Sequence, residues 1–266
     1  MDSAIEHRDP SKILDLSNIR FQLIRLEDTI TFHLIERVQF PLNSAIYKPG
    51  AIPIPNSDLS LFDFILRDTE RLHSLVRRYQ SPDEYPFFPE AIEEPILKPL
   101  SYPKVLHENN VVVNDRLKEA YINKILPACC SQPNRPERGE DQENYGSAAT
   151  MDVLCLQALS RRIHYGKFVA ESKFRSDTAR FVSLIKAKDI AGLDAAITDA
   201  KVEKKVLERL RLKAKTYGTD PDLTSNDQGK INVEAVVDMY RDYVIPLTKV
   251  VEVEYLLQRL KGTEWE

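Results

Sequence analysis

Apolar and polar residues alternate along much of the chain with the three- and four-residue spacing of amphipathic helices. The first such stretch runs from about Ser11, the expected N-cap, to about Phe40. Its apolar positions are Leu16, Ile19, Leu23, Leu26 and Ile30. The pattern predicts one long helix over residues 11–40, with an apolar face that packs against other helices.

The same periodicity predicts further helices downstream. They lie at about 59–79, 114–126, 177–187, 189–198 and 200–217. The most apolar helix is expected to follow Thr150, its predicted cap, and to continue to about Phe174 in the centre of the fold. A last helix is expected over 233–261, where Pro246 should bend it or divide it.

The segments between these stretches have the composition of connections. Residues 41–58 and 82–104 are rich in proline, whereas 131–147 and 218–230 are polar and lack periodicity. No internal repeat and no strand-like alternation occurs. We therefore predict an all-α fold that forms a single domain over 1–266, a bundle of about ten to twelve helices with long connecting loops.

Composition excludes several functional classes. Lys and Arg total 37 against 41 Asp and Glu, with the two signs interspersed, which argues against a nucleic-acid partner. The three cysteines, Cys129, Cys130 and Cys155, lack metal-ligand spacing and fit a reducing, cytoplasmic compartment. Neither a secretory signal nor an apolar run of membrane-spanning length is present, so we expect no membrane insertion.

One set of basic residues forms a narrow stripe on the predicted central helix. Arg162, Gly166, Val169 and Lys173 follow one another at steps of four, three and four. Arg162 and Lys173 would lie about 16 Å apart along the helix axis, and two long side chains leaning over Gly166 could bind a small dianion. The competing interpretation is a cationic face exposed to water, because most helical Lys and Arg residues are solvated.

Other candidates are less specific. In the last helix Thr248 and Glu252, followed by Tyr255 and Arg259, form a polar stripe that alone would indicate a solvent-exposed face. Arg20 lies at the edge of the first apolar stripe, where it could extend into solvent or into a cleft between helices. No metal-ligand pair or nucleophile motif occurs, and His164 is expected to be a packed or partly exposed histidine rather than a catalyst. These patterns lead only to a helical protein able to bind a small anion.

Several longer runs, in order along nearly the whole chain, resemble one family, the eukaryotic chorismate mutases. The fungal members are the nearer match, since no transit-like segment precedes the first helix. The runs are LSNIR (16–20), RLEDTI (25–30), IER (35–37), SPDE (81–84), PFFP (86–89), NYGS (144–147), LSRRIHYGKFVAE (159–171) and VEVEYLL (251–257).

The resemblance implies a Claisen rearrangement of chorismate to prephenate, in tyrosine and phenylalanine biosynthesis, without metal or other cofactor. By the family pattern, Arg20 and Arg162 hold the two carboxylates of the substrate. Lys173 points its ammonium group at the ether oxygen, where negative charge develops. The catalytic helices are then those near 11–40, 150–175, 200–217 and 233–261.

Three further residues match the family site, and a fourth position departs from it. Glu252 lies across the ether oxygen from Lys173, Thr248 binds substrate, and Glu203 receives the ring hydroxyl. Because a carboxyl group donates a hydrogen bond only when protonated, we expect activity to be favoured by mildly acidic pH. Asp199 stands where the family has asparagine, and an ionised aspartate would repel the dianionic substrate.

The resemblance also implies a homodimer that tyrosine inhibits and tryptophan activates, with regulatory elements near 72–80 and 131–150. Arg77 and Arg78 of one subunit would bind the amino acid together with residues of the other subunit. Those residues are Asn144, Gly146, Ser147 and Thr150. Two positions depart from the family: Glu143 replaces an asparagine, and Asn232 occupies the position of the allosteric switch threonine.

Two alternatives remain at this level. The chain could be a helical interaction module whose Arg162 and Lys173 face water, in which case removing either cation leaves its function intact. It could instead be an inactive paralogue or scaffold that retains only amino-acid binding at the dimer interface. Against the second stands the presence of all six catalytic candidates, which are Arg20, Arg162, Lys173, Glu203, Thr248 and Glu252.

Overall fold

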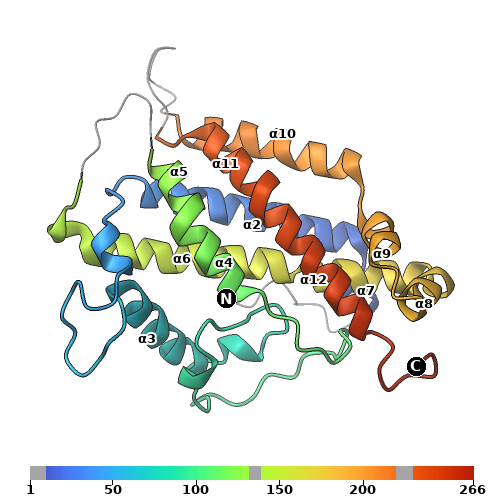
Figure 1. Ribbon diagram of the computed structural model, residues 1–266. Helices are drawn as coiled ribbons and strands as arrows, with labels where there is room; N and C mark the ends of the chain where they lie inside the picture. Colours follow the sequence, from blue (N-terminus) through green and yellow to red (C-terminus); the bar gives the residue numbers. More distant parts are fainter. Residues whose placement is uncertain (1–9, 132–138, 220–229) are drawn as a thin grey trace.

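The computed structural model describes residues 10–131, 139–219 and 230–266, and within these ranges the chain is helical with no regular strand (Figure 1). The α-helices are α1 (Pro10–Ile13), α2 (Leu16–Arg37), α3 (Leu61–Leu75), α4 (Asn114–Ala120), α5 (Leu126–Cys130), α6 (Tyr145–His164), α7 (Gly166–Ser176), α8 (Thr178–Lys186), α9 (Ile190–Ile197), α10 (Ala200–Tyr217), α11 (Val233–Met239) and α12 (Ile245–Gln258). The predicted all-α bundle with long connections is confirmed.

Shorter helical segments complete these elements. The 3₁₀ turns are η2 (Ser44–Tyr47), η3 (Arg78–Gln80), η4 (Pro89–Ala91) and η6 (Gln142–Asn144). Two π-helical segments, η5 (Tyr121–Ile125) and η7 (Tyr240–Val244), join α4 to α5 and α11 to α12. No helix in the described part of the chain has the length and apolar character needed to cross a membrane.

The predicted first helix is divided near its start. Asp15 caps α2 by accepting hydrogen bonds from the backbone N–H groups of Ser17 (2.9 Å) and Asn18 (3.2 Å). Because these donors would otherwise lack acceptors, the carboxylate stabilises a new helix start at Leu16. The predicted cap at Ser11 is therefore wrong, and α1 is a separate short turn.

The central helix also differs from its prediction at both ends. It begins at Tyr145, so Thr150 lies inside it and its hydroxyl donates to the carbonyl of Gly146 (2.8 Å). It is interrupted at Tyr165, after which α7 continues along nearly the same line (Figure 1). The prediction of one helix capped by Thr150 is therefore wrong, although residues 150–174 are helical except at this junction.

Pro246 divides the last helix, as predicted. Pro246 lies in the first turn of α12, directly after the π-helical segment η7. A proline has no N–H group to donate within a helix, and the wider π turn accommodates that gap. The result is one nearly continuous rod, α11–η7–α12, with a change of hydrogen-bond register in the middle.

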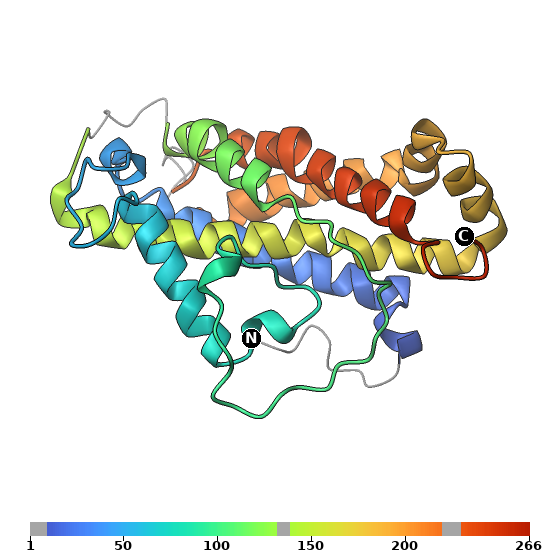
Figure 2. The ribbon, with the colours of Figure 1, turned by 60° about the horizontal axis from the view of Figure 1, so that its bottom comes forward.

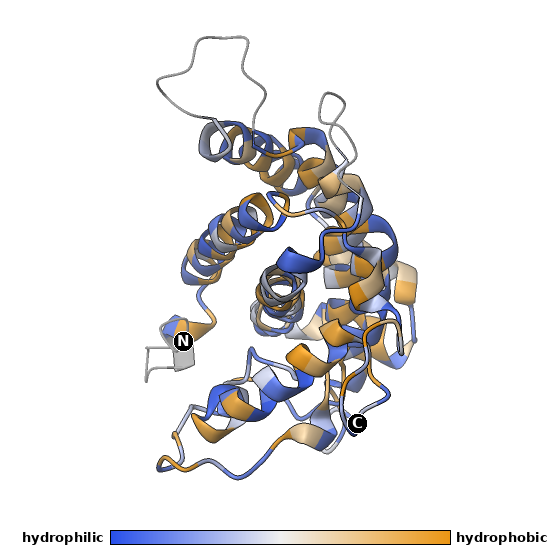
Figure 3. Cartoon of the chain, turned by 90° about the vertical axis from the view of Figure 1, so that its left-hand side faces the viewer, coloured by the Kyte–Doolittle hydropathy of each residue, from blue (hydrophilic) through white to orange (hydrophobic). Residues whose placement is uncertain are grey.

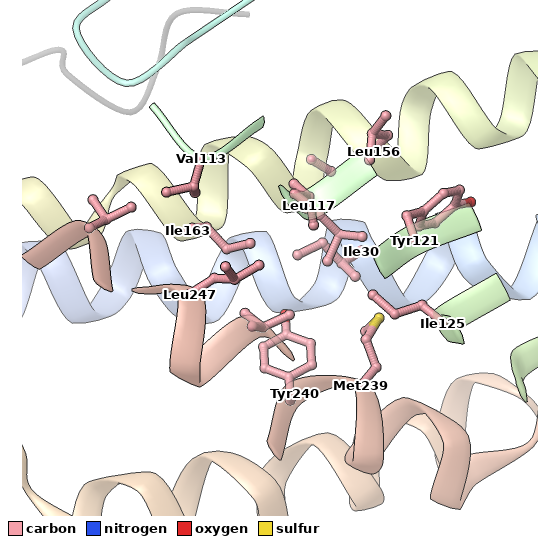
Figure 4. Close-up of a cluster of buried hydrophobic side chains, with 14 of the residues drawn as sticks. Ile30, Val113, Leu117, Tyr121, Ile125, Leu156, Ile163, Met239, Tyr240 and Leu247 are labelled. Carbon is pink, nitrogen blue, oxygen red and sulfur yellow. The ribbon is translucent and has the colours of Figure 1, made fainter. Parts of the chain in front are cut away.

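The core lies where α2, α6, α4–η5 and η7–α12 meet (Figure 4). Its buried side chains include Ile30, Leu117, Leu156, Ile163 and Leu247. Seen from the end nearest the start of α6, the helices present a mixture of apolar and polar positions around a shared interior (Figure 3). This is the arrangement expected of amphipathic helices that bury one face each.

A long segment without regular structure, residues 100–113, runs along the bundle to the start of α4 (Figure 2). Side chains of α6 and α7 hold it. The buried imidazole of His164 accepts a hydrogen bond from the backbone N–H of Val113 (3.1 Å), and the ammonium of Lys167 donates to the carbonyl of Val111 (2.5 Å). Burial lowers the pKa of His164 to about 4, so it is a neutral packed histidine, as predicted.

Candidate active site

The helices α7 and α12 pack closely against each other at Gly166. A Cβ atom at this position would lie 2.9 Å from Cγ2 of Thr248 and 3.1 Å from Cγ of Glu252. Glycine therefore allows α12 to lie directly against α7. As a result Thr248 and Glu252, whose stripe alone would indicate a solvent-exposed face, are only 8% and 7% exposed.

Arg162 projects from the last turn of α6 into the same region. It is 6% exposed, and its Nε and Nη1 atoms are buried without a hydrogen-bond acceptor among the described residues. A buried cation with empty donors is costly unless an anion occupies the site. The interpretation of Arg162 as part of a solvated cationic face is therefore wrong.

Lys173 lies two turns beyond Gly166 on α7 and is half-buried. Its ammonium group donates a hydrogen bond to the carbonyl of Ile197, the last residue of α9. The next residue, Thr198, has a buried hydroxyl without a hydrogen-bond partner among the described residues. The end of α9 thus supplies further polar groups beside Lys173.

Glu252 lies among positive charges and is nevertheless neutral at pH 7. Burial raises the pKa of this carboxyl group to about 8, against the opposing effect of the positive charges of Lys173, Arg162 and Lys249. A protonated carboxyl group is a hydrogen-bond donor. The geometry therefore combines two cations with a neutral acid, a set suited to an anion that also presents an uncharged acceptor oxygen.

The two predicted acids of α10 differ in their surroundings. Glu203 is half-buried and its carboxylate pairs with Nζ of Lys249 on α12 at 2.8 Å. Asp199 is exposed and caps α10, accepting hydrogen bonds from the N–H groups of Lys201 (3.0 Å) and Val202 (3.1 Å). Asp199 thus has a local structural role that does not depend on a ligand.

Arg20 is the one predicted catalytic residue at the periphery. It is exposed on α2 and has no hydrogen bond or ion pair within the described residues. Glu27, seven residues later on the same face of the helix, is fully buried and forms a bidentate ion pair with Arg209 of α10, with both N–O distances 2.7 Å. This face of α2 therefore turns toward α10, and Arg20 lies at its exposed end.

A buried ionic network beside Arg162 was not predicted. Besides Arg209, Lys213 contacts both Glu27 (3.4 Å) and Asp28 (2.7 Å). The adjacent Tyr240 has a buried hydroxyl without a partner in the described residues, and burial, only partly offset by the charge of Arg162, raises its pKa. The sequence signal was an acid at position 27 inside the apolar stripe of the first helix.

The first group of predicted regulatory residues lies beyond the C-terminal end of α3. Arg77 has a left-handed backbone (φ 72°) and donates to the carbonyl of Lys98 at 2.7 Å. Arg78 contacts the carboxylate of Glu84 (3.0 Å) and Oε1 of Gln157 on α6 (2.7 Å). Arg78 and Gln157 line a cavity of about 220 Å³ between α2 and α6.

The second group lies at the start of α6. Glu143, Gly146, Ser147 and Thr150 are exposed, whereas Asn144 is half-buried and donates to Asp141. No hydrogen bond or ion pair between described residues joins Arg77 or Arg78 to this group in one chain. Much of the predicted loop 131–147, namely residues 132–138, lies outside the described residues.

Asn232, the predicted switch residue, caps α11. Its Oδ1 atom accepts a hydrogen bond from the N–H group of Ala235 (3.2 Å), and its Nδ2 atom donates to the carbonyl of Ser131 (3.3 Å). One side chain therefore joins the start of α11 to the residue that follows α5. The predicted polar turn 218–230 is mostly outside the described residues, which resume at residue 230.

Comparisons with known proteins agree on one family. The model of the family "chorismate mutase type II" matches residues 144–253. A chorismate mutase of Emericella nidulans is 70% identical over 267 residues, which cover 100% of both chains. The structure of a chorismate mutase from Candida albicans in complex with L-Trp has a TM-score of 0.90 and 45% identity, and the match covers 97% of this chain and 96% of that one. AtCM1 with tyrosine bound in its allosteric site has a TM-score of 0.83 and 42% identity, over 95% and 99% of the two chains.

Proposed function

The chain belongs to the chorismate mutase family, and on that premise we propose that it catalyses the rearrangement of chorismate to prephenate without a cofactor. The observation that carries the proposal is the buried Arg162, whose Nε and Nη1 donors lack acceptors among the described residues. Arg162 lies close enough to the neutral acid Glu252 for its charge to affect the pKa of that carboxyl group. Chorismate is a dianion with an ether oxygen at the bond that breaks. The site offers cations for the carboxylates and a neutral donor for the oxygen.

The reaction needs positioning and preorganised charge more than covalent chemistry. The side chain of chorismate must fold over the ring while negative charge develops on the ether oxygen. We assign Arg162 and Arg20 to the two carboxylates, Arg20 reaching the substrate from the exposed end of its helix face. Packing already fixes the donor groups of Arg162, so they need not reorganise while the reaction proceeds.

The ether oxygen would lie between Lys173 and Glu252. Lys173 donates to the carbonyl of Ile197 without substrate, and the developing oxyanion competes for the same ammonium group. Glu252 enters the reaction protonated, so it donates rather than repels. We assign the ring hydroxyl to Glu203 and a supporting contact to Thr248, which lies directly against Gly166. The carboxylate of Asp199 already caps α10, so of these residues it has the least support for a contact with the substrate.

We also propose that the chain is a homodimer inhibited by tyrosine and activated by tryptophan. Within one chain, no hydrogen bond or ion pair between described residues joins Arg77 or Arg78 to the second group of regulatory residues, which is compatible with a site shared between two subunits. The related structures with L-Trp and with tyrosine bound in an allosteric site support binding of aromatic amino acids. Asn232 would act as the switch through its cap of α11. The three unbridged cysteines support a cytoplasmic location.

The test is the loss of chorismate absorbance with purified protein at pH 5.5 and 7.5, with prephenate identified as product. We expect rapid cofactor-free conversion that tyrosine slows and tryptophan restores. Arg162→Ala should abolish most of the rate, whereas Arg241→Ala, which removes an exposed arginine paired with Asp238, should leave it unchanged. A wild-type rate equal to the spontaneous reaction would support the inactive paralogue instead.

A further inference from the structure

The polar stripe of α12 extends beyond the residues that the proposed function uses. Thr248 and Glu252 meet α7 at Gly166, and the stripe continues through Tyr255 and Arg259. Tyr255 is fully buried and Arg259 largely so. Because residues at i, i+4, i+7 and i+11 lie on one helix face, both halves of the stripe face α7. The second half therefore has a partner on that helix.

That partner is Glu171, a fully buried residue on α7 that the proposed chemistry does not use. Its carboxylate accepts hydrogen bonds from the hydroxyl of Tyr255 (2.6 Å) and from Nε (2.6 Å) and Nη2 (3.1 Å) of Arg259. Arg175, one turn later on α7, donates to the same carboxylate at 2.7 Å. One acid thus joins α7 to two side chains of the α12 stripe, Tyr255 and Arg259, and also pairs with Arg175 on its own helix.

Glu171 is ionised in this environment. Burial acts to raise its pKa, but the hydrogen bonds from Arg259, Tyr255 and Arg175 outweigh burial, and the pKa lies below its usual value. A buried carboxylate with several charge-assisted hydrogen bonds is strongly directional. By contrast, the contact at Gly166 consists of close packing, which fixes the distance between the helices.

The two contacts together determine how α12 is placed on α7. A slide of α12 along its axis by about 1.5 Å, the rise of one residue, would move the carboxyl group of Glu252 by the same distance. A displacement of that size at a reacting atom can cost a factor of about 10² in rate. The contacts of Glu171 with Tyr255 and Arg259, on the same stripe as Glu252, prevent this displacement.

We propose that Glu171 is a positioning residue whose contacts with Tyr255 and Arg259 fix the register of α12 on α7, and with it the place of Glu252 opposite Lys173. The inference deepens the proposed function and rests on it. The segment 105–107 covers these contacts, since the hydroxyl of Tyr255 accepts from the N–H group of His107 (2.9 Å) and Arg175 donates to the carbonyl of Val105 (3.0 Å).

Steady-state kinetics of Glu171→Gln test the positioning role. Glutamine keeps the size of the side chain and an acceptor for Tyr255 but loses the charge that holds Arg259. We expect kcat to fall by about 10–100-fold, with KM changed by less than about threefold, because the groups that bind the carboxylates are untouched. Tyr255→Phe removes one hydrogen bond without a change of charge and should lower kcat by about 3–10-fold.

Glu208→Gln is the matched control, since Glu208 is exposed on α10 and its carboxylate pairs with Lys204 one turn away, at 3.8 Å. It should change neither constant. Circular dichroism and thermal unfolding establish that each variant is folded. If Glu171→Gln does not fold, Tyr255→Phe carries the test by itself. An unchanged kcat in a folded variant overturns the proposal.

A second readout does not depend on turnover. Carbon-13 NMR of labelled glutamate carboxyl groups in the substrate-free protein follows the titration of Glu252, which faces Lys173, Arg162, Lys249 and Asp194. We expect its midpoint to fall by about one pH unit or more in Glu171→Gln, because a displaced carboxyl group becomes more hydrated. If the wild type does not convert chorismate, the proposed function fails, and this midpoint still decides the register proposal. If the titration midpoint of Glu252 is the same in Glu171→Gln as in the wild type, the register proposal is overturned, whatever change is seen in kcat and KM.

Discussion

Arg37 and Arg162 are both buried in the helical bundle, but their surroundings differ. Arg37 forms an ion pair with Asp152 at 2.6 Å. Its other nitrogens donate to a hydroxyl and three carbonyls, those of Tyr47, Phe40, Pro41 and Leu42. Arg162 has two nitrogens with no acceptor among the described residues. The first arginine is satisfied by the fold, whereas the second requires a ligand.

The buried acids repeat this contrast. Asp152 accepts hydrogen bonds from Arg37, Tyr47 and Tyr121 at 2.5–2.8 Å. Glu252 has no hydrogen bond or ion pair within the described part of the chain and is protonated at neutral pH, its pKa being raised to about 8 by burial. Among these four buried groups, the two whose partners are complete maintain the fold, and the two whose partners are incomplete lie in the candidate site.

The largest effect expected from this contrast is on activity. Arg162→Ala removes the group that binds a substrate carboxylate in a buried site, so kcat/KM should fall by a factor on the order of 10³. The free energy of unfolding should stay the same or rise, because a buried cation without partners is lost. Chorismate kinetics and urea unfolding measure the two quantities. A large loss of stability in this variant would contradict the assignment of Arg162 to the ligand.

Arg37→Met should have the opposite profile. The substitution leaves Asp152 as a buried acid without its cation, and the free energy of unfolding should fall by about 3 kcal/mol. At 15 °C, where the variant is still folded, kcat/KM should remain within about threefold of the wild type. Urea unfolding and low-temperature kinetics are the measurements. A specific loss of kcat/KM without loss of stability would break the contrast between the two arginines.

The pH profile tests the contrast between the two acids. Glu252 acts protonated, so activity is present below the pKa of its carboxyl group and is lost as pH rises through about 8. Because kcat/KM reports the free enzyme, it should fall by about tenfold between pH 7 and pH 9. The structure thus places the loss of activity at higher pH than the mildly acidic preference predicted from the sequence alone. In Glu252→Gln, a permanent donor, the decline should be absent; an identical decline would assign it to another group.

The smallest effect is expected at Asp199, which is satisfied by its own helix. Asparagine caps a helix about as well as aspartate, so Asp199→Asn should leave the melting temperature unchanged. Removal of a negative charge from the edge of a site for a dianion should raise kcat/KM by about two- to threefold. Kinetics at low ionic strength give the clearest measurement. A large fall instead would mean that the aspartate itself contacts the substrate.

The hydrophobic periodicity was sufficient to predict the helices α3, α8, α9 and α10 to within a few residues. It failed where a single polar side chain or a change of helix type decided the outcome. Asp15 starts a new helix within the stretch 11–40 that was predicted as one helix, and the break at Tyr165 lies in the most apolar stretch of all. Periodicity reports which face is buried but contains little information on local hydrogen-bond competition.

The candidate site shows the same division. The residue spacing placed Arg162 and Lys173 on one stripe, and the resemblance to a family supplied roles for them. Nothing in the spacing distinguished the buried Arg162 from a solvated arginine, because exposure depends on which helices cover the stripe. Glu27 and its ion pairs with α10 were missed for that reason, as they join residues 182 positions apart in the chain.

The sequence by itself therefore determined that this protein is a bundle of amphipathic helices with a cationic stripe, since helical periodicity is a local property. Only the tertiary structure decided that Gly166 lets α12 lie against α7, that Arg162 lacks acceptors and that Glu252 holds a proton. Those three facts depend on contacts between distant segments, because burial and the loss of water set the energy of a charge inside a protein.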